Sequence, residues 1–179
     1  GSAGTALSGI SLTGPSGASV LSPASTLLEK SSLTEAEVAK ALGLEGISLT
    51  DFNPYASGVD ADNALAFEKV ATQVITTVKA ISAAAQGSGA AAEAASNAAF
   101  ASLVSVVASK ATAGEALDLS SATDLATIQT QVATDLVTVA GVDATAFNAV
   151  LSTAMTAVGH INTQVAAITD TDLTASATK

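Results

Sequence analysis

Apolar residues recur at steps of three and four along four long stretches of the chain, which are 61–85, 90–111, 122–141 and 143–168. This spacing places them on one face of an α-helix. The last stretch carries a near-heptad seam, which is typical of a helix that packs along its whole length. The seam consists of Phe147, Leu151, Ala154, Val158, Ile161, Val165 and Ile168. We therefore predict four long helices, and short connections between them favour an up-down bundle.

Capping residues predict two further, short helices ahead of the bundle. Ser22 precedes Pro23, and a serine followed by proline is a common helix start. Thr34 and Glu37 have the spacing of a capping box, in which each side chain satisfies a backbone N–H of the other. Gly43 then supplies a left-handed stop. The two predicted helices span 23–30 and 34–42.

The first part of the chain has a different pattern. Residues 3–21 combine Gly, Ser and Pro with short alternating apolar runs, which predicts an extended β arm with one or two short strands and a turn at 14–17. An isolated strand pair is marginal in water, so we expect the arm to pair with a neighbour. The predicted fold is mainly α: an up-down bundle of about four long helices plus two short ones, preceded by this arm. The expected divisions are 1–21 (arm), 22–171 (bundle) and 172–179 (tail).

Composition narrows the function classes. The chain has 179 residues, enough for one domain with a hydrophobic core. Its 16 acidic residues against six lysines and no arginine give a formal net charge of −10. Such a surface repels phosphate backbones, so we predict no nucleic-acid binding. No apolar run reaches the roughly 18 residues of a membrane span, so we predict no membrane insertion.

Cysteine is absent, which excludes disulfides, cysteine nucleophiles and thiolate metal sites. His160 is the only histidine, and a general base or metal ligand needs partners within reach. The nucleophile motif G-x-S-x-G does not occur. We therefore predict that the protein is not an enzyme, and a pocket in which His160 meets carboxylates would be the exception.

A cluster of hard oxygen ligands lies in the segment DFNPYASGVDAD, and calcium is the cation that it fits. The spacing departs from that of an EF-hand loop. The same side chains would also serve as helix caps and turn formers, so both interpretations stay open. The candidate ligands are Asp51, Asn53, Asp60 and Asp62.

Three short motifs, VLSPASTLL at 20–28, ALGL at 41–44 and DFNP at 51–54, follow one another in this order. Together with an alanine-rich helix after them, they resemble a helical module of very long bacterial cell-surface proteins, over residues 10–85. The resemblance implies an adhesin or surface-layer setting, often with cadherin-like or hemolysin-type calcium repeats, and transfers no catalytic residue.

Two functions follow as expectations. The first is a non-enzymatic, extracellular structural or assembly module at a bacterial cell surface, which contacts neighbouring domains or identical subunits through its N-terminal arm. The alternative is a recognition domain for a surface glycan, peptide or partner protein. Recognition sites favour aromatic anchors, for which the loops offer Phe52 and Tyr55. The absence of cysteine, together with abundant Ser, Thr and Ala, agrees with a secreted location.

Overall fold

The computed structural model describes residues 10–169, and this part of the chain is helical without strands. Its six α-helices and one short 3-10 helix are α1 (Pro23–Lys30), α2 (Glu35–Ala41), α3 (Ala61–Gly87), α4 (Ala92–Ala113), α5 (Ala122–Asp135), η1 (Leu136–Thr138) and α6 (Ala144–Ala166).

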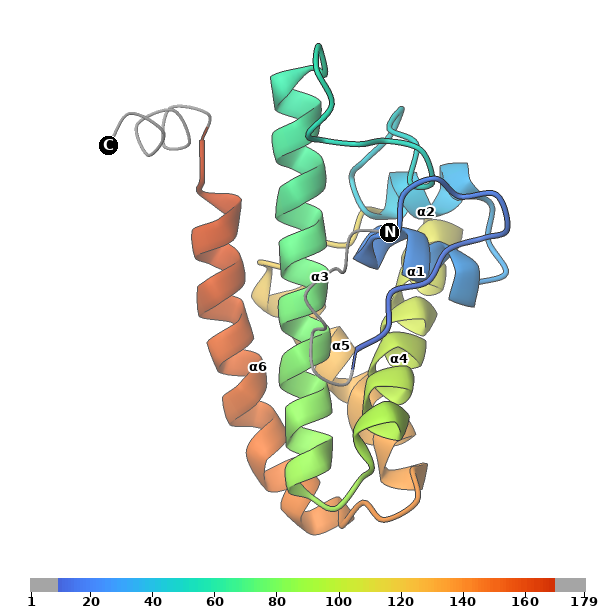
Figure 1. Ribbon diagram of the computed structural model, residues 1–179. Helices are drawn as coiled ribbons and strands as arrows, with labels where there is room; N and C mark the ends of the chain where they lie inside the picture. The colour runs from blue at the N-terminus through green and yellow to red at the C-terminus, as the bar shows by residue number, and fades with distance from the viewer. Residues whose placement is uncertain (1–9, 170–179) are drawn as a thin grey trace.

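The four long helices form a bundle in which successive helices run in opposite directions (Figure 1). Helix α3 packs against α4 and α6, and α5 packs against the same two helices, so the four close into a ring. The predicted bundle is confirmed. Helix α5 ends earlier than predicted, because the chain tightens into η1 before the turn at Gly141.

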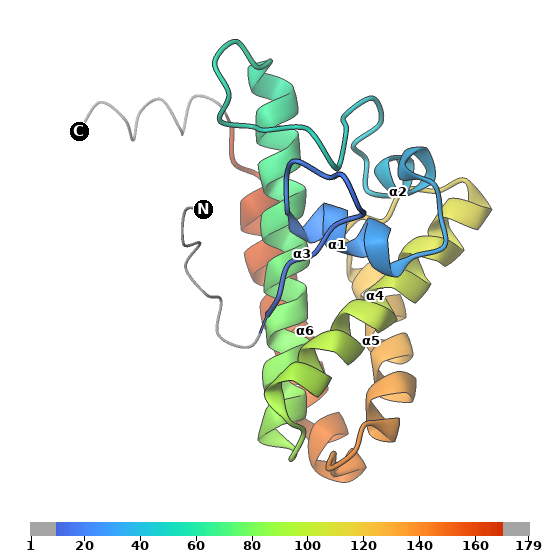
Figure 2. The same cartoon turned by 45° about the vertical axis from the view of Figure 1, so that its right-hand side comes forward.

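The two short helices lie along the side of the bundle. Helix α1 crosses α3 and α4, and α2 rests on α4 (Figure 2). Ser22 and Thr34 cap them as predicted, and Thr34 forms the predicted capping box with Glu37. Ser22 also forms a capping box, with Ser25, which was not predicted. At the end of α2, Gly43 has a φ of +69° and the Leu44 amide donates to the Ala39 carbonyl, 2.7 Å away. These contacts form a Schellman motif, so the predicted stop is confirmed.

The predicted β strands are wrong for the described part of the arm, 10–21; residues 1–9 lie outside the described residues. Thr13 donates its amide to the Thr26 hydroxyl at 2.9 Å, and the amides of Ser19 and Val20 both donate to the Thr50 carbonyl. A strand needs a ladder of successive partners, and one shared carbonyl and one hydroxyl do not supply it. A turn is present one residue later than predicted, over 15–18, because the Ala18 amide donates to the Pro15 carbonyl at 3.0 Å.

The core is built mainly from aliphatic side chains together with the buried rings of Phe67, Phe100 and Phe147, and it holds one layer of polar groups near the end where α6 terminates. Asn162 is fully buried and donates to the Leu119 carbonyl at 2.8 Å and to the Thr77 hydroxyl at 3.3 Å. Gln73 donates to the backbone carbonyl of Asn162 at 3.0 Å. The layer therefore links α3 and α6 to the segment before α5. Because these buried polar groups form hydrogen bonds with one another only when the helices are correctly aligned, they favour a single register of the helices.

The predicted seam of α6 is divided between the interior and the surface. Phe147, Leu151 and Val158 are buried, whereas Ile161 is 45% exposed and Ile168 is half-buried. A strict seven-residue repeat drifts by about 20° per heptad around a straight helix. The last members of the seam have therefore turned away from the core.

Helix α4 is long and apolar enough to cross a membrane, judged by length and composition alone. A tightly packed core helix has the same character, and α4 contacts α1, α2, α3 and α5. The absence of membrane insertion stays a prediction.

A candidate binding groove at the end of the bundle

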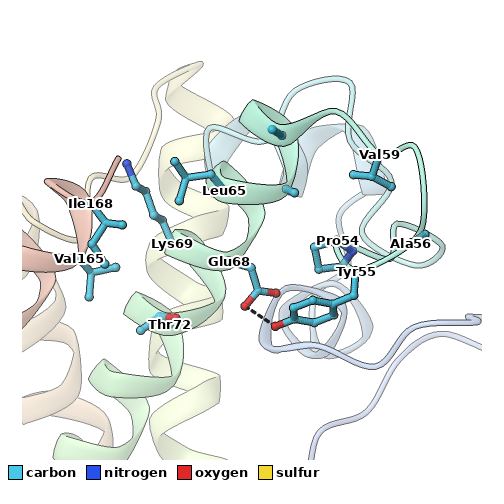
Figure 3. Close-up of a pocket in the computed structure, with 12 residues that line it drawn as sticks. Pro54, Tyr55, Ala56, Val59, Leu65, Glu68, Lys69, Thr72, Val165 and Ile168 are labelled. Atoms are coloured by element: carbon cyan, nitrogen blue, oxygen red, sulfur yellow. Dashed lines mark hydrogen bonds between the residues drawn. The ribbon is translucent and has the colours of Figure 1, made fainter. Parts of the chain in front are cut away.

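An apolar groove of ≈ 570 Å³ lies where α3 begins and α6 ends, beside the loop that leads into α3 (Figure 3). The loop supplies one wall, and side chains of α3 and α6 supply the others. Most of the lining is aliphatic, with one aromatic ring and two charged groups. The lining residues are Pro54, Tyr55, Ala56, Val59, Ala61, Ala64, Leu65, Glu68, Lys69, Thr72, Val165 and Ile168.

Tyr55 forms the rim of the groove and is 81% exposed, the highest fraction among the large hydrophobic side chains described. Its hydroxyl donates to Glu68 Oε2 over 2.9 Å, so the ring leans toward α3 (Figure 3). The hydrogen bond to Glu68, with partial burial and the carboxylate charge, raises the pKa of Tyr55. The Tyr55 amide donates to Asn53 Oδ1 at 3.0 Å, which fixes the turn. An aromatic surface is therefore held in place at the edge of an apolar hollow.

Lys69 joins the two helices of the groove. Its Nζ donates to the carbonyl of Ala166 over 3.0 Å, at the last residue of α6. The last turn of α6 has no basic residue of its own, and its carbonyls carry a partial negative charge. Lys69 supplies the missing cation from α3, so the α6 side of the groove is anchored.

Phe52, the other aromatic candidate, has a structural role. It is half-buried and packs on Phe67 of α3, with ring centroids 5.3 Å apart. A tilted pair at this distance contributes about 0.5–1.5 kcal/mol beyond its buried area. It holds the loop against the helix, and Tyr55 is left as the surface aromatic.

The four predicted calcium ligands are spread over the same loop and the start of α3, and three of them have other partners. Asp51 accepts hydrogen bonds from Ser19 Oγ at 2.7 Å and Thr50 Oγ1 at 3.2 Å, and these bonds lower its pKa. The side chain of Asn53 accepts the Tyr55 amide, and Asp60 caps α3 by accepting the Asn63 amide at 2.9 Å.

Asp62, the fourth candidate, is exposed in the first turn of α3. Across residues 10–169, the structure brings together no group of three or more His, Asp and Glu side chains suited to a metal ion. Backbone carbonyls and water can complete a calcium shell, so the calcium site stays a prediction.

His160 lies on the exposed side of α6, in a trough between α5 and α6. The trough is lined by uncharged side chains such as Ser120, Gln129 and Thr163, together with aliphatic groups. His160 therefore has no carboxylate beside it in this trough.

Two features of the site were missed by sequence reasoning. The groove residues Leu65, Glu68 and Lys69 lie on the outer side of α3. The apolar spacing in the sequence identifies only the core-facing side of this helix. Glu35 was also missed: its Oε1 accepts from the Leu49 amide at 2.6 Å and from the Ser48 hydroxyl at 2.9 Å, which ties the loop to α2. The sequence shows only that Glu35 is an acidic residue in the first turn of a predicted helix. Such residues are common at helix starts, so this position does not identify a distant partner.

Comparison with known proteins gives no relative for this chain: no protein-family model, curated protein or solved structure matches it. Its function is therefore argued from the groove and from the surfaces around it.

Proposed function

We propose that this chain is a non-enzymatic structural module at a bacterial cell surface, where it joins neighbouring domains or identical subunits into a larger assembly. The observation that carries the proposal is the groove beside Tyr55. It is apolar, it opens at one end of a rigid bundle, and its two charged groups are already hydrogen-bonded, Glu68 by Tyr55 and Lys69 to Ala166. Such a surface favours contact with an apolar segment of another polypeptide.

Three polar groups that the sequence offered for chemistry have structural partners: Asp51, Asn53 and Asp60 hold the loop and the start of α3. Glu35, which the sequence did not single out, ties the loop to α2. Buried Gln73 and Asn162 join helices. These roles support a structural reading of the polar residues.

The N-terminal arm is proposed as a second contact with a neighbour. Residues 13, 19 and 20 are hydrogen-bonded within the chain, so their pairing with a neighbour would require these bonds to break. We therefore assign the pairing to residues 1–9. The first 28 residues carry no charged side chain, so the arm can approach an acidic molecule without electrostatic repulsion.

Sedimentation velocity over a range of concentrations tests this proposal, with the full chain and a chain that begins at Ile10. We expect species larger than a dimer for the full chain and their loss on truncation. Circular dichroism and the melting temperature of both chains check that the bundle stays folded when these residues are removed. Equal distributions for the two chains would exclude the arm as an assembly contact.

Recognition of a surface peptide or glycan is the second candidate, and the exposure of Tyr55 favours it. Tyr55 is the only tyrosine and tryptophan is absent, so tyrosine fluorescence reports on the groove alone. A glycan and peptide array, followed by fluorescence titration of any binder, tests this function. Binding that leaves Tyr55 fluorescence unchanged would place the site elsewhere.

A further inference from the structure

Helix α6 carries a second apolar stripe on its surface, besides the one that it buries. The buried stripe is Phe147, Leu151, Met155 and Val158. The surface stripe has steps of four, three, four, four and three, close to a heptad repeat. Its members are Val150, Ala154, Ala157, Ile161, Val165 and Ile168.

Three members of the surface stripe are exposed, and the other three, Ala154, Val165 and Ile168, are half-buried. Val150 is 46% exposed and Ile161 is 45% exposed, and Ala157 between them is exposed as well. At its upper end Val165 and Ile168 line the groove together with residues of α3 (Figure 3). The stripe therefore continues the groove down the side of the bundle. Apolar residues at this spacing are what one helix presents to another in a coiled coil.

The absence of charge on α6 favours a second copy of the chain as the partner of the stripe. Among the four long helices, α6 alone contains no Asp, Glu or Lys, in a chain whose formal net charge is −10. In a twofold contact each copy presents the same patch to the other, so a charged patch would face its own charge. Two copies can therefore approach through α6 without placing like charges together.

The central pair of side chains also matches in size when α6 is set antiparallel to itself. With the twofold axis level with Gly159, Ala157 lies opposite Ile161 of the partner copy, so a small residue meets a large one. Val150 lies opposite Ile168 of the partner copy. Alternation of small and large residues lets helices interdigitate at 8–10 Å. Antiparallel helices also pair opposite ends of their dipoles.

We propose that a second copy of the chain packs its α6 antiparallel along this stripe, which gives a twofold homodimer whose axis passes near Gly159. The inference rests on the proposed assembly function, and it names both the partner and the surface. The arm then joins dimers into larger species, because the proposed arm contact uses a different surface from the α6 contact.

Disulfide trapping tests the geometry, since the chain has no cysteine of its own. One chain carries Ala157→Cys, and a second chain, distinguishable by mass, carries Ile161→Cys. Antiparallel packing brings the two substituted positions together, within disulfide reach. Two copies of Ala157 are displaced by about 6 Å along the axis, at a rise of 1.5 Å per residue. We expect mixed disulfides to dominate when the chains are combined; same-chain disulfides in equal or greater amount would overturn the antiparallel dimer.

A charge substitution tests the surface itself. Ile161→Glu places a carboxylate inside the proposed contact, and we expect dimerisation to weaken by about tenfold or more, since a buried, unpaired charge is costly. Ala149→Glu is the matched control: it adds the same charge to an exposed position of the same helix outside the stripe. Circular dichroism checks that both variants fold, which the exposure of both positions favours.

The outcomes separate the dimer from the assembly function. A monomeric full chain, or dimers equally stable in Ile161→Glu and in the control, overturns the proposed dimer. If larger species nevertheless depend on residues 1–9, the assembly function stands without the dimer. If dimers form and respond to Ile161→Glu while removal of residues 1–9 changes nothing, the dimer stands and the arm contact fails.

Discussion

Tyr55 is the only tyrosine, so its ionisation can be followed by near-ultraviolet absorbance without interference. The hydrogen bond to Glu68 holds its pKa above the ordinary value of 10.0. We expect Glu68→Gln to lower the pKa toward that value, because the carboxylate charge is removed. The folded pKa is the higher one, so the stability that this bond contributes is complete below about pH 10 and is lost as pH rises through the folded pKa.

Glu45→Gln is the control for this titration, since it removes one carboxylate from an exposed position that is not a partner of Tyr55. If both variants titrate alike, the contact between Tyr55 and Glu68 does not persist in solution.

The predicted calcium site is tested by thermal unfolding. If the loop binds calcium, added calcium raises the melting temperature, since a ligand that binds only the folded state stabilises it. Asp60→Asn together with Asp62→Asn should abolish the rise. Asparagine is as good a helix cap as aspartate, so the start of α3 is preserved. An equal rise with magnesium, or in the double variant, would show that the effect is general screening.

Single residues show what sequence reasoning can find. Ser22, Thr34 and Gly43 were identified correctly because a cap or stop acts within a few residues of its own position. The contact of Tyr55 with Glu68, 13 residues away, and that of Glu35 with Leu49 depend on how loop and helix pack. Neither contact has a local pattern, so neither could be predicted.

At the level of elements, two loops meet at the end of the bundle opposite the groove. Asp143 donates its amide to the Ser88 carbonyl at 2.8 Å, and Gly89 and Gly141 lie against each other's backbone. A Cβ on either glycine would collide with the carbonyl of the other, and both have positive φ, +110° and +88°. We expect Gly89→Ala and Gly141→Ala each to lower the free energy of unfolding, measured with urea.

Gly114→Ala is the matched control for these two variants. Gly114 also has a positive φ, +72°, but an added Cβ would meet nothing within 4 Å. It should therefore cost only the left-handed strain, about 1–2 kcal/mol. The two loop glycines should cost about 1–3 kcal/mol more, since backbone atoms must move. Three equal losses would mean that the loops separate readily.

The helices themselves were largely predictable, because a 3.6-residue apolar period is repeated over many residues in each. The apolar arm was not: its alternating residues Ile10 and Leu12 fit a strand, but they pack on the helical core. The seam of α6 was predicted as one line. Only the packed bundle shows that Phe147 and Ile161 belong to different faces.

At the scale of the whole molecule, charge is unevenly distributed: from residue 119 to residue 169 the chain has three acidic residues and no lysine. The remaining charges of the described part lie between residues 29 and 118, with an excess of carboxylates, so folding brings like charges together. We expect the melting temperature to rise as sodium chloride increases from about 0.01 M to about 0.15 M, because the Debye length falls from roughly 30 to 8 Å and the repulsion is screened.

Glu29→Gln with Glu93→Gln, which removes two of these carboxylates, should raise the melting temperature at low salt and reduce its dependence on salt. A melting temperature that falls with salt would show that attraction, such as that of Lys110 to Asp124 at 2.8 Å, outweighs the repulsion.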